Sequence, residues 1–95
     1  MFAVILSYIR PLEEVDQALA AHRDFLAEFY AAGFGIASGR QVGASGGVII
    51  AQAPSRAALE AELAKDPFKV KGLARYDIYE FEARTVHPAL KGIVS

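Results

Sequence analysis

The sequence predicts an α+β fold with the element order β-α-β-β-α-β. Four segments are rich in β-branched and aromatic residues, which is typical of strands. Two other segments carry apolar residues at helical spacing, and a short glycine-rich connection joins the second and third strands, which favours an antiparallel hairpin. The expected strands are residues 2–9, 34–41, 47–53 and 73–82, and the expected helices follow Pro11 and Ser55.

Length and composition set limits on the class of protein. The 95 residues suffice for one core, so we expect a single domain over residues 1–95. A hydrophobic fraction of 54% is high for so small a chain and favours contact with another chain. The net charge of −1 gives no field for nucleic acid or an anionic membrane. With no cysteine there is neither a disulfide nor a thiolate metal site.

The first strand and helix carry the clearest patterns. Residues 2–9 are apolar at both odd and even positions, so both faces of this strand are expected to be covered. They lack a basic leader and a cleavage site, and no stretch reaches membrane-spanning length, so a cytoplasmic protein is expected. The helix begins after Pro11, ends at Gly33 and has one inward stripe. That stripe comprises Val15, Leu19, His22, Leu26 and Phe29.

The second half of the chain completes the fold. Ser55 is an expected helix N-cap, Asp66-Pro67 interrupts that helix, and the last strand follows Gly72. The resulting order is ferredoxin-like, with two helices on one face of a four-stranded antiparallel sheet. Because the other face is also apolar, we expect a homodimer whose sheets pack face to face. Residues 83–95 are expected to form an arm that packs on a neighbouring chain.

His22 and Asp66 form the candidate catalytic pair. A histidine within an apolar helical stripe is either a core residue with a satisfied hydrogen bond or a general acid–base. Asp66 stands directly before Pro67, which is the signature of an N-cap for a short helix over residues 67–71. The two roles of Asp66 are compatible, because a carboxylate has several acceptor sites and a capped carboxylate is held rigidly.

Polar residues near the strand ends are candidates for binding a small molecule. Arg40, with nearby lysines and Arg75, makes a basic sector that either attracts an anionic or phenolate-like molecule or is simply a solvated face. The two histidines lack metal-ligand spacing, so no zinc site is expected, and the glycine-rich connection lacks the ending of a phosphate loop. The aromatic residues do not alternate with basic ones as in nucleic-acid-binding strands. The candidate binding residues are Ser7, Tyr8, Ser38, Arg40 and Phe68.

The chain resembles the YCII-like family. The resemblance rests on the strand that runs into Arg10-Pro11, on Ala-Ala-His22-Arg-Asp-Phe-Leu, on Ala-Ser38-Gly, and on Asp66-Pro-Phe-x-x-x-Gly-Leu. It implies a dimeric barrel built from ferredoxin-like subunits, with an active site made by a His–Asp pair that corresponds to His22 and Asp66. One member of that family removes HCl from chlorinated hydroxyquinol-type compounds without an external cofactor, so none is expected here.

Three functions remain open at this point. The leading hypothesis is a cofactor-independent lyase or isomerase, similar to a dehydrochlorinase, that acts on a small cyclic phenolic or lactone-like compound. In it His22 moves a proton, Asp66 supports the imidazolium, and Ser38 or Arg40 steadies an oxyanion. The alternative is a non-enzymatic dimeric module that binds a small molecule or a protein. A cofactor-free monooxygenase is a third possibility, by fold analogy alone.

Overall fold

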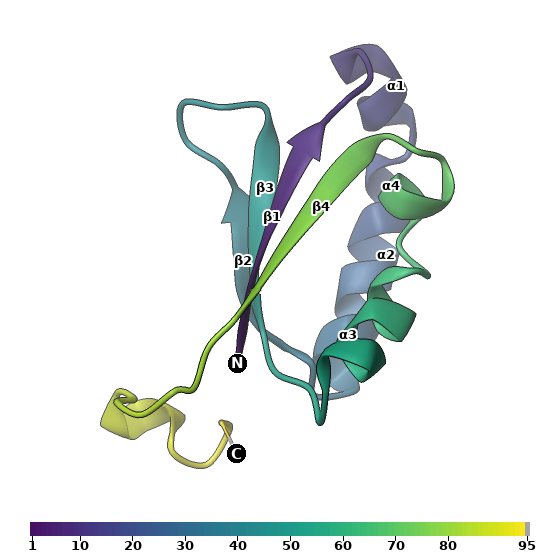
Figure 1. The fold of residues 1–95 in the computed structure, drawn as a ribbon. Helices are drawn as coiled ribbons and strands as arrows, with labels where there is room; N and C mark the ends of the chain where they lie inside the picture. The colour runs from purple at the N-terminus through teal and green to yellow at the C-terminus, as the bar shows by residue number, and fades with distance from the viewer. Residues whose placement is uncertain (95) are drawn as a thin grey trace.

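A single four-stranded antiparallel sheet carries all the α-helices on one of its faces (Figure 1). The computed structural model describes residues 1–94, and the strand order is β2-β3-β1-β4. The α+β, ferredoxin-like prediction is therefore confirmed, and the strand ends differ from the predicted ones by a residue or two. The elements are β1 (Phe2–Tyr8), α1 (Leu12–Gln17), α2 (Leu19–Ala31), β2 (Gly35–Arg40), β3 (Gly46–Ala51), α3 (Arg56–Leu63), α4 (Pro67–Val70) and β4 (Ala74–Glu80).

The first helical region is two helices rather than the single helix predicted. Between α1 and α2, Ala18 has φ −98° and ψ −1°, and its N–H donates to the Val15 carbonyl, which makes a tight last turn for α1. Ala18 is buried at this break. The sequence has neither a glycine nor a proline there to mark it. The buried side chains of α2 are Phe25 and Phe29, and His22 lies on the same side of the helix, with its side chain 12% exposed.

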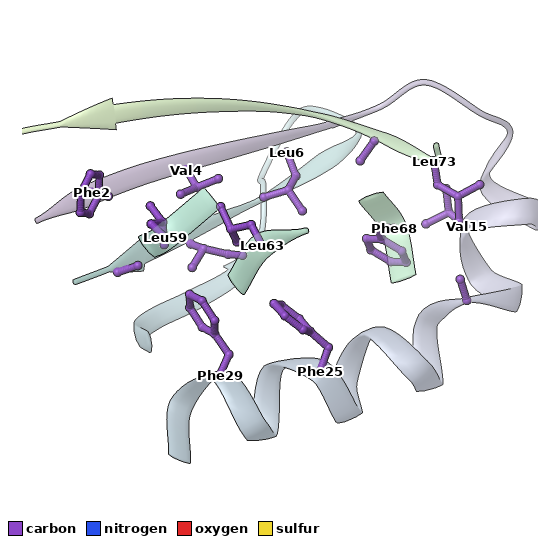
Figure 2. Close-up of a cluster of buried hydrophobic side chains, with 14 residues drawn as sticks. Phe2, Val4, Leu6, Val15, Phe25, Phe29, Leu59, Leu63, Phe68 and Leu73 are labelled. Carbon is purple, nitrogen blue, oxygen red and sulfur yellow. The ribbon is translucent and has the colours of Figure 1, made fainter. Parts of the chain in front are cut away.

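The hydrophobic core fills the space between the sheet and the helices. Figure 2 shows Phe25 and Phe29 pointing from α2 toward the sheet, where the side chains of β1 meet those of α3. Phe68 of α4 is buried in the same cluster and closes it beside Val15 and Leu73. The remaining labelled members are Phe2, Val4, Leu6, Leu59 and Leu63.

The register of the central strand fixes which residues face the helices. Phe2, Val4 and Leu6 are buried, so Ala3 and Ile5 lie on the opposite face, which none of the helices in residues 1–94 covers. Their partners on that face are Ile50 and Val48 of β3 and Tyr79 of β4; the last of these is 62% exposed. Both faces of the first strand are expected from the sequence to be covered, and within residues 1–94 the helices cover one of them.

One glycine allows β3 to approach β1. A Cβ atom on Gly46 would lie 1.8 Å from the Leu6 carbonyl oxygen, so no other residue fits that position without movement of the backbone. The close approach places Gly47 beside Leu6 and opposite Arg40 of β2. These residues line the end of the sheet at which the candidate site lies.

The segment after β4 folds back on its own chain. Phe81 exchanges backbone hydrogen bonds with Met1, and a short 3₁₀ turn follows over Pro88–Leu90. The Gln52 side chain donates to the Ile93 carbonyl at 2.7 Å and to the Gly33 carbonyl at 3.2 Å, which ties the tail to the corner after α2. None of the helices in residues 1–94 is long and apolar enough to cross a membrane.

Candidate active site

The site is built around the turn between α3 and β4. Asp66 is the N-cap of α4: its Oδ1 accepts from the Phe68 N–H at 3.0 Å, and Pro67 occupies the first helical position. The predicted cap is thus confirmed. Gly72, with φ +64°, then takes a left-handed conformation and turns the chain into β4. This short sequence places the Asp66 carboxylate in the interior.

The same carboxylate contacts His22 of α2. The His22 Nδ1 atom lies 2.8 Å from Asp66 Oδ1, and the Asp66 side chain is 0% exposed. An ionised carboxylate can only accept, so His22 Nδ1 must be the donor. The neutral imidazole therefore carries its proton on Nδ1 and presents the lone pair of Nε2, which is the form a general base needs.

Aromatic rings fix the plane of the imidazole. The His22 and Phe68 rings are parallel within 4°, with their centroids 4.0 Å apart. Tyr8 of β1 packs edge-on against Phe68, with centroids 5.8 Å apart and planes at 84°. Because Asp66 holds one edge of the imidazole and Phe68 covers one face, the ring has little freedom to turn.

Tyr76 is a member of this site that the sequence did not reveal. Its hydroxyl donates to Asp66 Oδ2 at 2.5 Å from the inward face of β4, opposite Leu6 in the register. Burial, and then the hydrogen bond to Asp66, raise the pKa of Tyr76 well above its ordinary value of 10.0. The phenol therefore stays protonated and able to donate throughout the neutral range. The alternation of side chains along the last strand places Tyr76 on the face toward the helices. It does not predict that the Tyr76 hydroxyl contacts Asp66.

A cavity of about 230 Å³ opens beside His22. Of the candidate binding residues, Tyr8, Ser38, Arg40 and Phe68 line it. Ser7 does not line it, because it alternates with Leu6 and Tyr8 along β1 and so lies on the uncovered sheet face. Asp66 does not line it either and lies behind His22. The remaining lining residues are Leu6, Leu19, Arg23, Leu26, Gly39, Gly47, Val48 and Ile49.

The Ser38 hydroxyl lines this cavity and is hydrogen-bonded to Tyr30. The Tyr30 hydroxyl donates to Ser38 Oγ at 2.8 Å, so the proton of Ser38 itself is available to another acceptor. Tyr30 reaches Ser38 because its ring crosses Gly35, where a Cβ atom would come within 2.7 Å of the ring. Ser38 can therefore act as a hydrogen-bond donor toward a molecule in the cavity.

The site combines an oriented histidine, a small partly apolar cavity and several hydrogen-bond donors. Among residues 1–94, no group of three or more His, Cys, Asp or Glu side chains is arranged to hold a metal ion. The class of protein that this defines is a small α+β domain with a buried His–Asp pair beside a binding cavity.

Comparison with known proteins identifies the family. The YCII-related domain matches residues 1–82, and the chain belongs to this family. A structure similar to this one is 5-chloro-2-hydroxyhydroquinone dehydrochlorinase (TftG) from Burkholderia phenoliruptrix AC1100, solved in complex with 2,5-dihydroxybenzoquinone. It shares 23% identity and a TM-score of 0.72 over 86% of this chain and 94% of that chain, a likeness in fold. No curated protein matches the sequence.

Replacing Tyr76 with Phe tests its role in holding Asp66. Tyr76→Phe leaves a buried carboxylate oxygen without its donor, so the free energy of unfolding should fall by about 1–3 kcal/mol at neutral pH. Tyr79→Phe, which removes a hydroxyl from a largely exposed ring on the same strand, should change it little. Urea denaturation of both variants measures the difference.

The same pair of variants gives a pH dependence. Since folding raises the Tyr76 pKa, its contribution to stability is complete below pH 10 and is lost as the pH rises above the pKa of the unfolded chain. The wild type and Tyr79→Phe should both lose this part of their stability in alkaline solution, whereas Tyr76→Phe should not. Parallel alkaline losses in all three proteins would contradict the assignment.

Proposed function

We propose that this protein is a cofactor-independent lyase that eliminates HCl, or isomerises by proton transfer, on a small cyclic phenolic or lactone-like compound. The observation that carries the proposal is the free Nε2 of His22, a base held by Asp66 beside a cavity large enough for one ring. The shared fold with a dehydrochlorinase supports the reaction class.

The elimination needs one base and a way to support negative oxygen. In the keto tautomer of the substrate, the carbon that bears chlorine is saturated. His22 Nε2 takes the proton of a ring hydroxyl, the electrons of that O–H bond form a new C=O bond, and a ring double bond shifts to the carbon that loses chloride. Chloride leaves with the electron pair of the carbon–chlorine bond, and the proton passes from His22 to water. Asp66 stabilises the imidazolium formed on the way, because its carboxylate already bonds Nδ1–H.

The donors around the cavity suit a substrate that gains negative charge on oxygen. Ser38, oriented by Tyr30, and the Arg40 guanidinium both reach the cavity that His22 lines. Such preorganised donors stabilise an oxyanion as it develops. Phe68 and Tyr8 provide aromatic surface for the ring of the substrate.

We also propose that two copies pack their uncovered sheet faces together. Ala3, Ile5, Val48 and Ile50 form an apolar patch on this face, beside the Arg75–Asp77 ion pair of β4, and none of the helices described for this chain covers it. Val48 also lines the cavity, so the partner would lie at the border of the site. Burial of this face would account for the high apolar content of so small a chain.

Activity of the histidine variants tests the reaction. On a panel of chlorinated hydroquinones and hydroxyquinols, the wild type should release chloride, and His22→Ala should lower the rate at least about 100-fold because the base is lost. His87→Ala replaces the second histidine of the chain, which is exposed, and should leave the rate of chloride release unchanged. Equal chloride release by the wild type and His22→Ala would contradict the mechanism. A wild type without turnover on the whole panel would favour the non-enzymatic binding module.

The oligomeric state tests the sheet-to-sheet contact. The wild type should sediment as a dimer, and Ile50→Asp should shift it to monomer because it places a charge in the middle of an apolar interface. Val42→Asp is the control: it places the same charge at a hairpin residue that is 97% exposed, and this variant should remain a dimer. A monomeric wild type, or a dimer that Ile50→Asp leaves intact, would show that this face is not the interface.

A further inference from the structure

The arginines of this chain divide into two groups by their ion pairs. Four of the six are paired with a neighbouring carboxylate at 2.7–3.1 Å: Arg10 with Glu14, Arg56 with Glu60, Arg75 with Asp77, and Arg84 with Glu82. Arg23 and Arg40 form no ion pair and no side-chain hydrogen bond within residues 1–94. These two are also the arginines that line the cavity beside His22.

The two guanidinium groups reach the cavity from different parts of the fold. Arg23 follows His22 on α2, and Arg40 ends β2, two residues after Ser38 and opposite Gly47. Their convergence on one small space is therefore a product of the tertiary structure. In a chain whose net charge is −1, two positive charges without counter-ions are gathered at the same place as the proposed base.

The rest of the lining does not neutralise these charges. No aspartate or glutamate lines the cavity among the described residues, and Asp66 is fully buried behind His22. The oxygens of Asp66 are already used by His22, Tyr76 and the Phe68 N–H. A cavity with one sign of charge and apolar walls concentrates its electric field and attracts small ions of the opposite sign.

The size and lining of the cavity limit what such an ion can be. About 230 Å³ is below the usual range of roughly 300–1,000 Å³ for drug-sized ligands, which leaves room for one ring with its substituents. Leu19, Leu26 and Phe68 supply apolar contacts to such a ring. Guanidinium groups bind planar oxyanions through paired N–H donors, which suits a carboxylate or an ionised ring hydroxyl.

We propose that Arg23 and Arg40 make this cavity selective for a single-ring compound that carries an oxyanion before the reaction begins. The two arginines hold that group, and His22 Nε2 acts at another position of the same ring. This rests on the proposed function for the reaction, whereas the selectivity in binding is independent of turnover.

The test compares the binding of matched ring compounds by calorimetry. The probes are 2,5-dihydroxybenzoate, its neutral analogue 2,5-dihydroxybenzamide, and 2,5-dihydroxybenzoquinone, which ionises at its ring hydroxyls. The wild type should bind at least one of the two anions about tenfold or more tightly than the amide, and its anion affinity should fall as salt is added. Comparison of the two anions shows whether the cavity prefers a carboxylate or an ionised ring hydroxyl.

Arginine variants assign the effect to the two residues. Arg23→Met and Arg40→Met should each lower the anion affinity about tenfold and leave the weak binding of the amide unchanged. Arg10→Met, which removes an exposed arginine paired with Glu14 outside the cavity, should bind as the wild type does. Equal affinity of the wild type for the anions and the amide, or anion affinity that survives both substitutions, would overturn the proposal.

His22→Gln separates this proposal from the reaction. The variant should keep the preference for anions while losing turnover, because the arginines rather than the base make the contact. An anion preference in a protein that turns over no compound would uphold this proposal and contradict the proposed function. Turnover of neutral rings without any anion preference would contradict this proposal and uphold the proposed function.

Discussion

The buried carboxylate of Asp66 is the constraint on which the site depends. A charge with no exposed surface is costly unless its oxygens are bonded, and here they accept from three elements. The donors are His22 Nδ1 on α2, the Phe68 N–H on α4 and the Tyr76 hydroxyl on β4. One side chain thus joins two helices and an edge strand at the point where the proposed chemistry occurs.

This arrangement links the stability of the fold to the proposed function. The same three donors that allow Asp66 to be buried also hold it rigid, so its contact with Nδ1 fixes both the tautomer and the direction of the His22 ring. Phe68 contributes twice, since its N–H bonds Asp66 while its ring stacks on the imidazole. The negative charge is used inside the protein, whereas the two unpaired arginines leave positive charge facing the cavity.

Local signals in the sequence were enough for the elements and for Asp66. The Asp66-Pro67 pair is a strong local signal for an N-cap, and the helical spacing predicts that His22 lies beside the core. Features that depend on tertiary contacts are harder to predict from the sequence. Tyr76 contacts Asp66 because β4 pairs with β1. The break at Ala18 has neither a glycine nor a proline to mark it. Ser7 and Tyr8 lie on opposite faces because side chains alternate along a strand, so only Tyr8 lines the cavity beside His22.

The tautomers of the two histidines test the central claim most directly. A long-range ¹H–¹⁵N NMR spectrum, recorded where both rings are neutral, reports which ring nitrogen carries the proton. Asp66 requires the proton of His22 on Nδ1, whereas His87 Nδ1 accepts from the Ala89 N–H and so requires its proton on Nε2. The account predicts opposite tautomers in one spectrum, with His22 alone losing its preference in Asp66→Asn. A His22 protonated on Nε2 in the wild type would contradict it.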